Sequence, residues 1–215
     1  MDEIWSLGDV VGYGPHPNEC CRITRDRTAL GMVGNHDLVV LGVVDVAEFN
    51  PDAGAAAQWT AEVLDEDSRA YLSALEPTAK RDGAELYHGS PRDPVWEYVL
   101  DPGAFRACFE LTDAEIVLIG HSHVPLLATL DETQMHAAHA PGGTEVELQD
   151  LRVVINPGSV GQPRDGDPRA AYVVLDLAGG HAEFRRVGYD VGRTQRELRE
   201  AGLPDSLAER LELGV

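Results

Sequence analysis

Lysine is almost absent from this sequence of 215 residues, in which Lys80 is the only one. The 17 basic residues are outnumbered by 37 acidic ones, and the formal net charge is −20. Proteins hold nucleic acids through clustered lysine and arginine, because these side chains neutralise the phosphate backbone. The composition therefore excludes a nucleic-acid surface as the main feature of this protein.

Cysteine is also scarce, with only Cys20, Cys21 and Cys108. An odd number without paired spacing is atypical of a disulfide framework or a structural zinc site. The adjacent pair is a poor candidate for a bridge, because that bond would strain the peptide between the two residues. Reduced thiols are typical of the cytoplasm, so we expect a cytoplasmic protein.

Long apolar runs are missing as well. No run approaches the roughly 20 residues that span a bilayer. The N-terminal MDEIWSLGDVV has two acids and no basic segment, which argues against a secretory signal. We therefore expect no membrane association, and the length suits a single domain over residues 1–215.

The residues that are present suggest alternating strands and helices, followed by a β-rich second half. Short apolar or alternating runs between Gly, Pro and Asp predict strands at 4–7, 29–33, 84–87, 115–119, 125–130, 144–149, 151–156, 170–176 and 181–187. Helix-favouring segments, several of which begin at proline, are 17–27, 51–75, 102–111, 191–201 and 204–212. This pattern predicts the α/β class.

Four of the predicted strands end in glycine-containing loops that carry polar side chains. These side chains are Asp9, Asn35, His36, His88, His121 and His123. Ligands in α/β proteins bind beyond the carboxyl ends of strands, so we expect the loops to converge on one site. The neighbouring glycines would let the backbone turn sharply there.

One carboxylate, one amide and several imidazoles form a mixed oxygen and nitrogen donor set. Such a set suits Mn, Fe, Co, Ni or Zn, whereas calcium prefers oxygen alone and structural zinc prefers thiolate. His121 and His123 could straddle two ions, with Asp9 bridging them. Two ions about 3.5–4 Å apart stabilise an in-line displacement at phosphorus and acidify a bound water.

The motifs GDVVGYG, GNHD, HGSP, GHSHVP and NPGSVGQPRDGDPRAAY resemble those of the calcineurin-like metallophosphoesterase superfamily. The nearest match is its group of small bacterial and archaeal phosphodiesterases. The resemblance extends from Asp9 to about Gln195. It implies a two-sheet α/β/β/α sandwich that hydrolyses a phosphodiester or phosphomonoester with a metal-bridging hydroxide. The implied cofactor is a pair of divalent transition metals in the full-length protein, with Mn preferred over Fe, Ni, Co or Zn.

The resemblance implies a metal role for five residues. Asp9 would bridge the two metals and take part in catalysis. The other ligands of the second metal would be Asn35, His88 and His121. His123 would bind the first metal.

Three further residues are expected at the substrate. The resemblance implies that His36 is a catalytic residue, which hydrogen-bonds the phosphate and protonates the leaving oxygen. Tyr13 and Arg164 are candidates for substrate binding. The substrate itself is expected to be a small phosphate ester, and the sequence leaves a homo-oligomer open.

One part of the family pattern is not found in this sequence. The family begins with a strand that ends in Asp-x-His, well before the Gly-Asp loop, whereas Gly8-Asp9 here follows only seven residues. The fold is therefore expected to lack its first strand and helix, and the 215-residue chain to be weakly active or inactive. Either its start was placed too late, or the protein is a degenerate member that serves as an interaction scaffold. The other motifs are intact, which favours the first explanation.

Other polar residues have simpler interpretations. Asn35 could be a helix N-cap instead of a ligand, or in addition to being one. His136 and His139 are expected to be exposed on the arm of a β-hairpin. The NPGS segment, residues 156–159, is expected to support the loops beneath the site.

Overall fold

The computed structural model describes residues 2–132 and 134–215 and divides into two compact units. The first comprises residues 2–77 with Asp190–Glu212, and the second comprises Thr78–Tyr189 with Leu213–Val215. The expectation of a single domain stays a prediction. Among the residues described, no helix is both long and apolar enough to cross a bilayer.

The first unit is built from helices. They are α1 (Pro17–Arg27), α2 (Asn35–Val40), the short 3₁₀ helix η1 (Val46–Glu48), α3 (Pro51–Val63), α4 (Glu66–Ser73), α6 (Val191–Glu200) and α7 (Asp205–Leu213). Proline opens α1 and α3, where its missing N–H costs no helical bond. The side chain of Asn50 caps α3 by accepting the N–H of Ala53 at 3.0 Å. These local signals explain why the helices predicted at 17–27, 191–201 and 204–212 are confirmed to within about one residue, whereas the helical segment 51–75 forms two helices, α3 and α4.

The strands predicted at 4–7 and 29–33 are not formed as regular strands. The two segments meet in one parallel bridge between Trp5 and Leu30. Two backbone bonds of 2.9 Å join them, from Ser6 N–H to the carbonyl of Leu30 and from Ala29 N–H to that of Ile4. A short pair of strands outside a larger sheet is only marginally stable, which explains why the apolar runs did not form longer strands.

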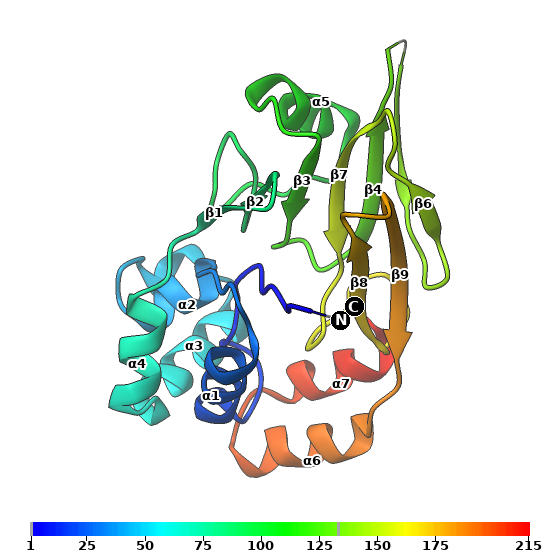
Figure 1. Cartoon of the computed structure of the whole chain (residues 1–215). Helices are drawn as coiled ribbons and strands as arrows, with labels where there is room; N and C mark the ends of the chain where they lie inside the picture. The colour runs from blue at the N-terminus through cyan, green and yellow to red at the C-terminus, as the bar shows by residue number, and fades with distance from the viewer. Residues whose placement is uncertain (1, 133) are drawn as a thin grey trace. The chain divides into compact units, whose positions relative to one another are not determined.

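The second unit contains two β-sheets (Figure 1). The six-stranded sheet has the order β1-β2-β3-β7-β4-β5, and the three-stranded sheet has the order β6-β9-β8. Their bounds are β1 (Thr78–Arg81), β2 (Ala84–Tyr87), β3 (Ile116–Ile119), β4 (Pro125–Leu130), β5 (Met135–His139), β6 (Glu145–Glu147), β7 (Arg152–Pro157), β8 (Ala170–Asp176) and β9 (His181–Val187). Among the described strands of the two sheets, the β2–β3 and β3–β7 pairs are parallel and the other pairs are antiparallel. The predicted α/β class with two sheets is confirmed.

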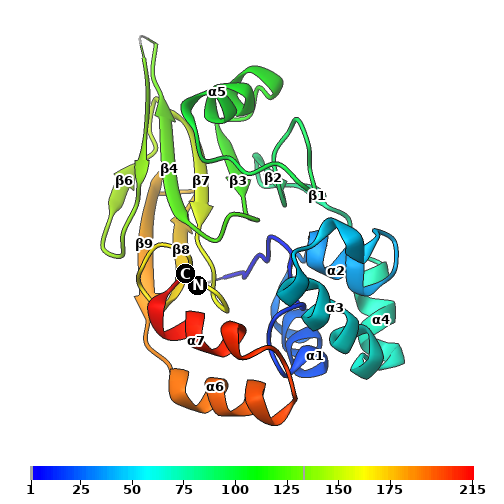
Figure 2. The same ribbon diagram turned by 180° about the vertical axis from the view of Figure 1, so that it is seen from behind.

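Helix α5 (Pro102–Leu111) covers one face of the larger sheet (Figure 2). Its buried Phe105 and Phe109 pack in one cluster with Val117 of β3 and Val154 of β7. The smaller sheet lies beside the larger one in both views, and β8 contacts β7. Because side chains alternate along a strand, β7 can contribute apolar residues to both of its faces.

Strand β1 was missed by the sequence reading. Its residues, TAKR, are mostly polar and half-exposed or exposed, as expected of a strand at the edge of a sheet. The two-residue turn Asp82-Gly83 joins it to β2, with φ of 49° and 84°. An Asp-Gly pair is a hairpin signal in its own right and could have revealed the strand.

Candidate metal centre

Asp9 is held against the start of α2 within the first unit. Its backbone has a left-handed φ of 54°, which is uncommon outside glycine. One carboxylate oxygen, Oδ1, accepts the backbone N–H of His36 at 3.0 Å. The two predicted site residues are therefore brought together, although they are 27 positions apart.

The carboxylate of Asp37 connects the loop before α1 with the loop that leads into α2. Its buried carboxylate accepts backbone N–H groups from Gly34 at 2.9 Å, Val10 at 3.2 Å and Val11 at 3.0 Å. Burial, and then the negative charge of Asp9, raise the pKa of Asp37, while the three N–H groups lower it. The sequence analysis missed this positioning role of Asp37.

Asn35 is the first residue of α2, not its cap. Gly34 is the N-cap, so the interpretation of Asn35 as a capping residue was wrong. The side chain of Asp37 instead reaches back to the N–H of Gly34 and closes the first turn. Asn35 is buried, and its metal role stays a prediction.

His36 is packed between aromatic rings. Its ring centroid lies 4.3 Å from that of Tyr13 and 4.4 Å from that of Phe49. A Cβ added at Gly12, whose φ is +135°, would lie 2.5 Å from Nδ1 of His36. Glycine is therefore required at position 12 for this approach, and Tyr13 is placed beside the predicted catalytic residue.

His121 and His123 both have strained backbone conformations in the second unit. Their φ angles are 59° and 60°, and only five non-glycine residues in the described parts of the chain have a positive φ. Three of these five are predicted metal ligands, since Asp9 is another. Such strain costs about 1–3 kcal/mol per residue and concentrates at functional sites.

The ring of His121 is fixed by a hydrogen bond and a stacking contact. Nε2 lies 3.1 Å from the carbonyl oxygen of Trp96, so Nε2 carries the proton in the neutral ring. Tyr98 stacks on the ring with centroids 4.1 Å apart, and the centroid of His88 lies 5.1 Å away. This tautomer leaves Nδ1 of His121 as the nitrogen with a lone pair.

The loop between β2 and α5 places Trp96 for this bond. The loop folds back on itself, with Gly89 N–H donating to Pro94 at 2.7 Å and Ser90 N–H donating to Asp93 at 2.9 Å. A Cβ on Gly89 would lie 2.5 Å from the carbonyl oxygen of Asp93. The glycine of the HGSP motif therefore permits the tight turn that follows His88.

His123 has the opposite tautomer. Its Nδ1 lies 2.9 Å from the carbonyl oxygen of Gln162, which leaves Nε2 with the lone pair. The backbone N–H of Arg164 donates to the carbonyl of His123 at 3.2 Å. Arg164 is thus placed next to a predicted ligand, as expected of a substrate-binding candidate.

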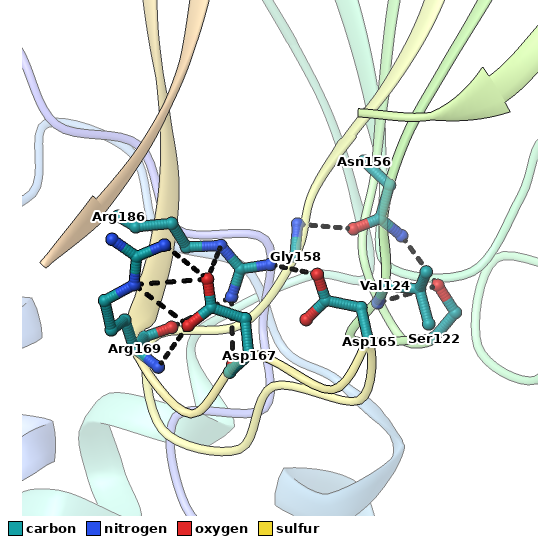
Figure 3. Close-up of polar contacts among 8 residues, drawn as sticks. All are labelled: Ser122, Val124, Asn156, Gly158, Asp165, Asp167, Arg169 and Arg186. Carbon is teal, nitrogen blue, oxygen red and sulfur yellow. Dashed lines mark hydrogen bonds and ion pairs between the residues drawn. The ribbon is translucent and has the colours of Figure 1, made fainter. Parts of the chain in front are cut away.

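The NPGS segment supports the histidine loop, as predicted (Figure 3). Asn156 is fully buried at the end of β7. Its amide donates to the carbonyl of Gly120 at 2.6 Å and to Oγ of Ser122 at 3.0 Å. Its Oδ1 accepts the N–H of Gly158 at 2.9 Å. The side chain therefore joins the two loops through two bonds and fixes its own loop through the third.

The donor chemistry of these residues fits a divalent transition metal. Metal-binding histidines usually donate their second ring N–H to a carbonyl or carboxylate, which fixes the ring and raises its basicity. His121 and His123 each have such a partner, at Trp96 and Gln162. In contrast, His136 and His139 are exposed on β5, as predicted.

Comparisons with known proteins identify the family. The family model for the calcineurin-like phosphoesterase superfamily domain matches residues 1–180. The whole chain is 36% identical to the uncharacterized protein MJ0912 of Methanocaldococcus jannaschii, of which it covers 87%. A metallophosphoesterase crystal structure from Sphaerobacter thermophilus shares 40% identity, with a TM-score of 0.89 over the whole chain and 89% of that protein. Hypothetical protein PH1004 from Pyrococcus horikoshii OT3 shares the fold, with a TM-score of 0.78 and 19% identity over 98% of this chain and 84% of that one.

This family is metal-dependent and acts on phosphoric esters, in agreement with the motifs from which the resemblance was first drawn. The chain belongs to the calcineurin-like phosphoesterase superfamily.

Proposed function

We propose that this protein hydrolyses a small phosphate ester with the help of two divalent transition-metal ions, preferably Mn²⁺. The observation that carries the proposal is the GHSH loop, where two histidines have strained backbones and each ring is tied through one nitrogen to a carbonyl. Strain of this kind is retained when the surrounding structure enforces it, and metal binding gives a reason for it.

The proposed ligands are the five residues for which the family resemblance implies a metal role. The bridging carboxylate is Asp9, the second metal takes Asn35, His88 and His121, and the first metal takes His123. When bound, the metals would supply positive charge for the phosphate and acidify a water molecule. Their charge would also allow an anionic substrate to approach a protein with a net charge of −20.

His36 is proposed as the general acid. Its ring is buried between Tyr13 and Phe49, so its orientation is restricted before a substrate binds. A histidine in this position could hydrogen-bond a phosphate oxygen and give a proton to the leaving oxygen. Tyr13 would then contact the substrate beside it, and Arg164 would do so beside His123.

Hydrolysis of p-nitrophenyl phosphate and bis-p-nitrophenyl phosphate tests the proposal. The metal-free protein should be inactive, and addition of Mn²⁺ should restore hydrolysis of at least one ester. His36→Ala should lower the rate by about a hundredfold or more, because general acid catalysis contributes 10²–10⁴-fold. His139→Ala is the matched control, since that histidine is exposed on β5.

The ratio of the two rates separates a phosphodiesterase from a phosphomonoesterase. A folded sample of the full-length protein without activity towards either ester, with any first-row divalent ion, would contradict the proposal, whereas weak activity of the 215-residue chain would not. Tight metal binding without hydrolysis would also contradict it. The alternative of a degenerate scaffold requires neither activity nor tight metal binding.

A further inference from the structure

The loop after β7 is tied to His123 on two sides. The carbonyl of Gln162 accepts from the imidazole of His123, and the N–H of Arg164 donates to the carbonyl of the same histidine. The N–H of Gln162 is itself anchored, at 2.9 Å from Oγ of Ser159. The positions of the side chains at 162 and 164 are therefore coupled to that of a proposed metal ligand.

The same loop is also fixed at its far end (Figure 3). Arg186 of β9 has a side chain that is only 3% exposed, and its guanidinium pairs with the carboxylate of Asp165. It also donates to the carbonyl of Arg169 at 2.9 Å and to that of Asp167 at 3.2 Å. Three bonds from one buried guanidinium hold the segment that follows Arg164, so the loop is a preorganised element.

The side chain of Gln162 orients the guanidinium of Arg164. Its Oε1 accepts from Nη2 at 3.0 Å and from Nε at 3.3 Å. Since arginine has donors only, the oxygen of the glutamine amide must face it. The NH₂ group of Gln162 is therefore the other end of an amide whose oxygen already contacts the guanidinium.

That NH₂ group is buried and makes no hydrogen bond to the described residues. Buried donors are rarely left in this way, because losing water without a replacement is unfavourable. An unsatisfied donor beside an oriented guanidinium suits an oxyanion, which can accept from both groups. His123, whose Nε2 keeps its lone pair in this tautomer, is the residue that this loop holds.

We propose that Gln162 Nε2 and the guanidinium of Arg164 bind a phosphate oxygen of the substrate, and that Gln162 is therefore a substrate-binding residue. This inference rests on the proposed function, because it assumes that His123 binds a metal at the phosphate. The ligand class is a tetrahedral oxyanion, either the phosphate of the ester or the inorganic phosphate that it releases.

Inorganic phosphate is the probe that tests this inference. Its affinity for the Mn²⁺-loaded protein is measured by calorimetry and by competitive inhibition of p-nitrophenyl ester hydrolysis. Gln162→Met removes the donor, and Gln162→Glu also places a carboxylate next to the oxyanion. Each change should weaken phosphate binding by about tenfold or more and raise KM in parallel, with little change in kcat.

Gln149→Glu is the matched control, because Gln149 is exposed between β6 and β7. It should leave phosphate affinity unchanged. Mn²⁺ affinity should also be unchanged in the Gln162 variants, because the backbone carbonyl that holds His123 is retained. Arg164→Lys keeps the charge but loses the planar fork, and it should weaken phosphate binding even if a Gln162 variant does not fold.

Unchanged phosphate affinity in the folded Gln162 variants would overturn the inference, even if the wild-type protein hydrolyses esters. Conversely, phosphate binding that depends on Gln162 in a protein without hydrolytic activity would support the inference and overturn the proposed function. These results therefore distinguish failure of the Gln162 inference from failure of the proposed function.

Discussion

At the scale of single residues, the site depends on unusual backbone conformations. Asp9, His121 and His123 have left-handed φ angles, and Gly12 has a φ that L-residues rarely adopt. The sequence indicated these positions through their glycine-rich loops. It could not indicate the hydrogen bonds that choose one ring nitrogen over the other, because those depend on carbonyl groups brought in from distant loops.

Gly12→Ala should impair catalysis and should also destabilise the fold, because a φ of +135° is unfavourable for alanine. A Cβ at this position would lie 2.5 Å from Nδ1 of His36, so the imidazole must move. A displacement of about 1 Å can lower a rate by about a hundredfold. Ester hydrolysis and the melting temperature are measured together. At Gly14 an added Cβ meets no atom within 4 Å, so Gly14→Ala should retain activity, and equal losses in both variants would contradict this account.

Asp167 should stabilise the folded protein in a pH-dependent way. The Arg169 guanidinium, at 2.6 Å, is the main cause that lowers the pKa of Asp167 to about 2. A carboxyl whose pKa is lowered on folding stabilises the protein above its ordinary pKa, near 3.8, and this contribution is lost as the pH falls towards 2.

Urea unfolding at pH 4 and pH 2 measures this effect. Asp167→Asn should lose less stability than the wild-type protein over that interval. An identical loss in both proteins would show that the ion pair contributes nothing to stability.

At the scale of secondary-structure elements, local sequence signals determined most of the fold. Helices that begin at proline were predicted at their first residue, as α1, α3 and α5 show. Strands β4, β8 and β9 were predicted with their observed bounds, because buried and exposed positions alternate or apolar runs end at turns. The polar edge strand β1 was missed because its stability comes from pairing with β2, not from its own side chains.

The same reason explains the error at the N-terminal segments. The runs at 4–7 and 29–33 are apolar enough for strands, but the pairing described for them is a single bridge between Trp5 and Leu30. Strand formation depends on neighbours that a local pattern does not specify. For the site, the residue types were predictable, whereas the positioning role of Asp37 and the contact of Gln162 with His123 are seen only in their hydrogen bonds.

Helix α5 should contribute strongly to the stability of the second unit. Phe109 is 4% exposed and packs in the cluster that joins α5 to the larger sheet. Phe109→Ala should lower the free energy of unfolding by about 3–5 kcal/mol, because it creates a cavity. Denaturant unfolding measures the change. Leu111→Ala lies on the same helix at a site that is 56% exposed, and it should have little effect.

At the scale of the whole molecule, the acidic composition disfavours binding of an anionic substrate, whereas the proposed metal ligands would favour it. A net charge of −20 disfavours anions in general, and the proposed metal centre would make one anionic substrate acceptable at one place. Membership of the calcineurin-like superfamily supports such a centre. The sequence predicted both features, whereas it could not specify the ester.

Metal binding should stabilise the folded protein. At a free Mn²⁺ concentration 100 times the dissociation constant, the gain is about 2.7 kcal/mol, which corresponds to a rise in melting temperature of roughly 5–10 °C. Scanning calorimetry of the chelator-treated protein, with and without Mn²⁺, checks the shift. His88→Ala should reduce it, and a shift of the same size in that variant would argue against His88 as a ligand.

The most direct test of the central claim is calorimetric titration of Mn²⁺ into the metal-free protein, with variants of the GHSH loop alongside. The account predicts specific binding to the wild-type protein, binding weakened by about tenfold or more in His121→Ala and His123→Ala, and wild-type binding in the control His139→Ala. Equal Mn²⁺ affinity in all four proteins, or no binding to the wild-type protein, would contradict it.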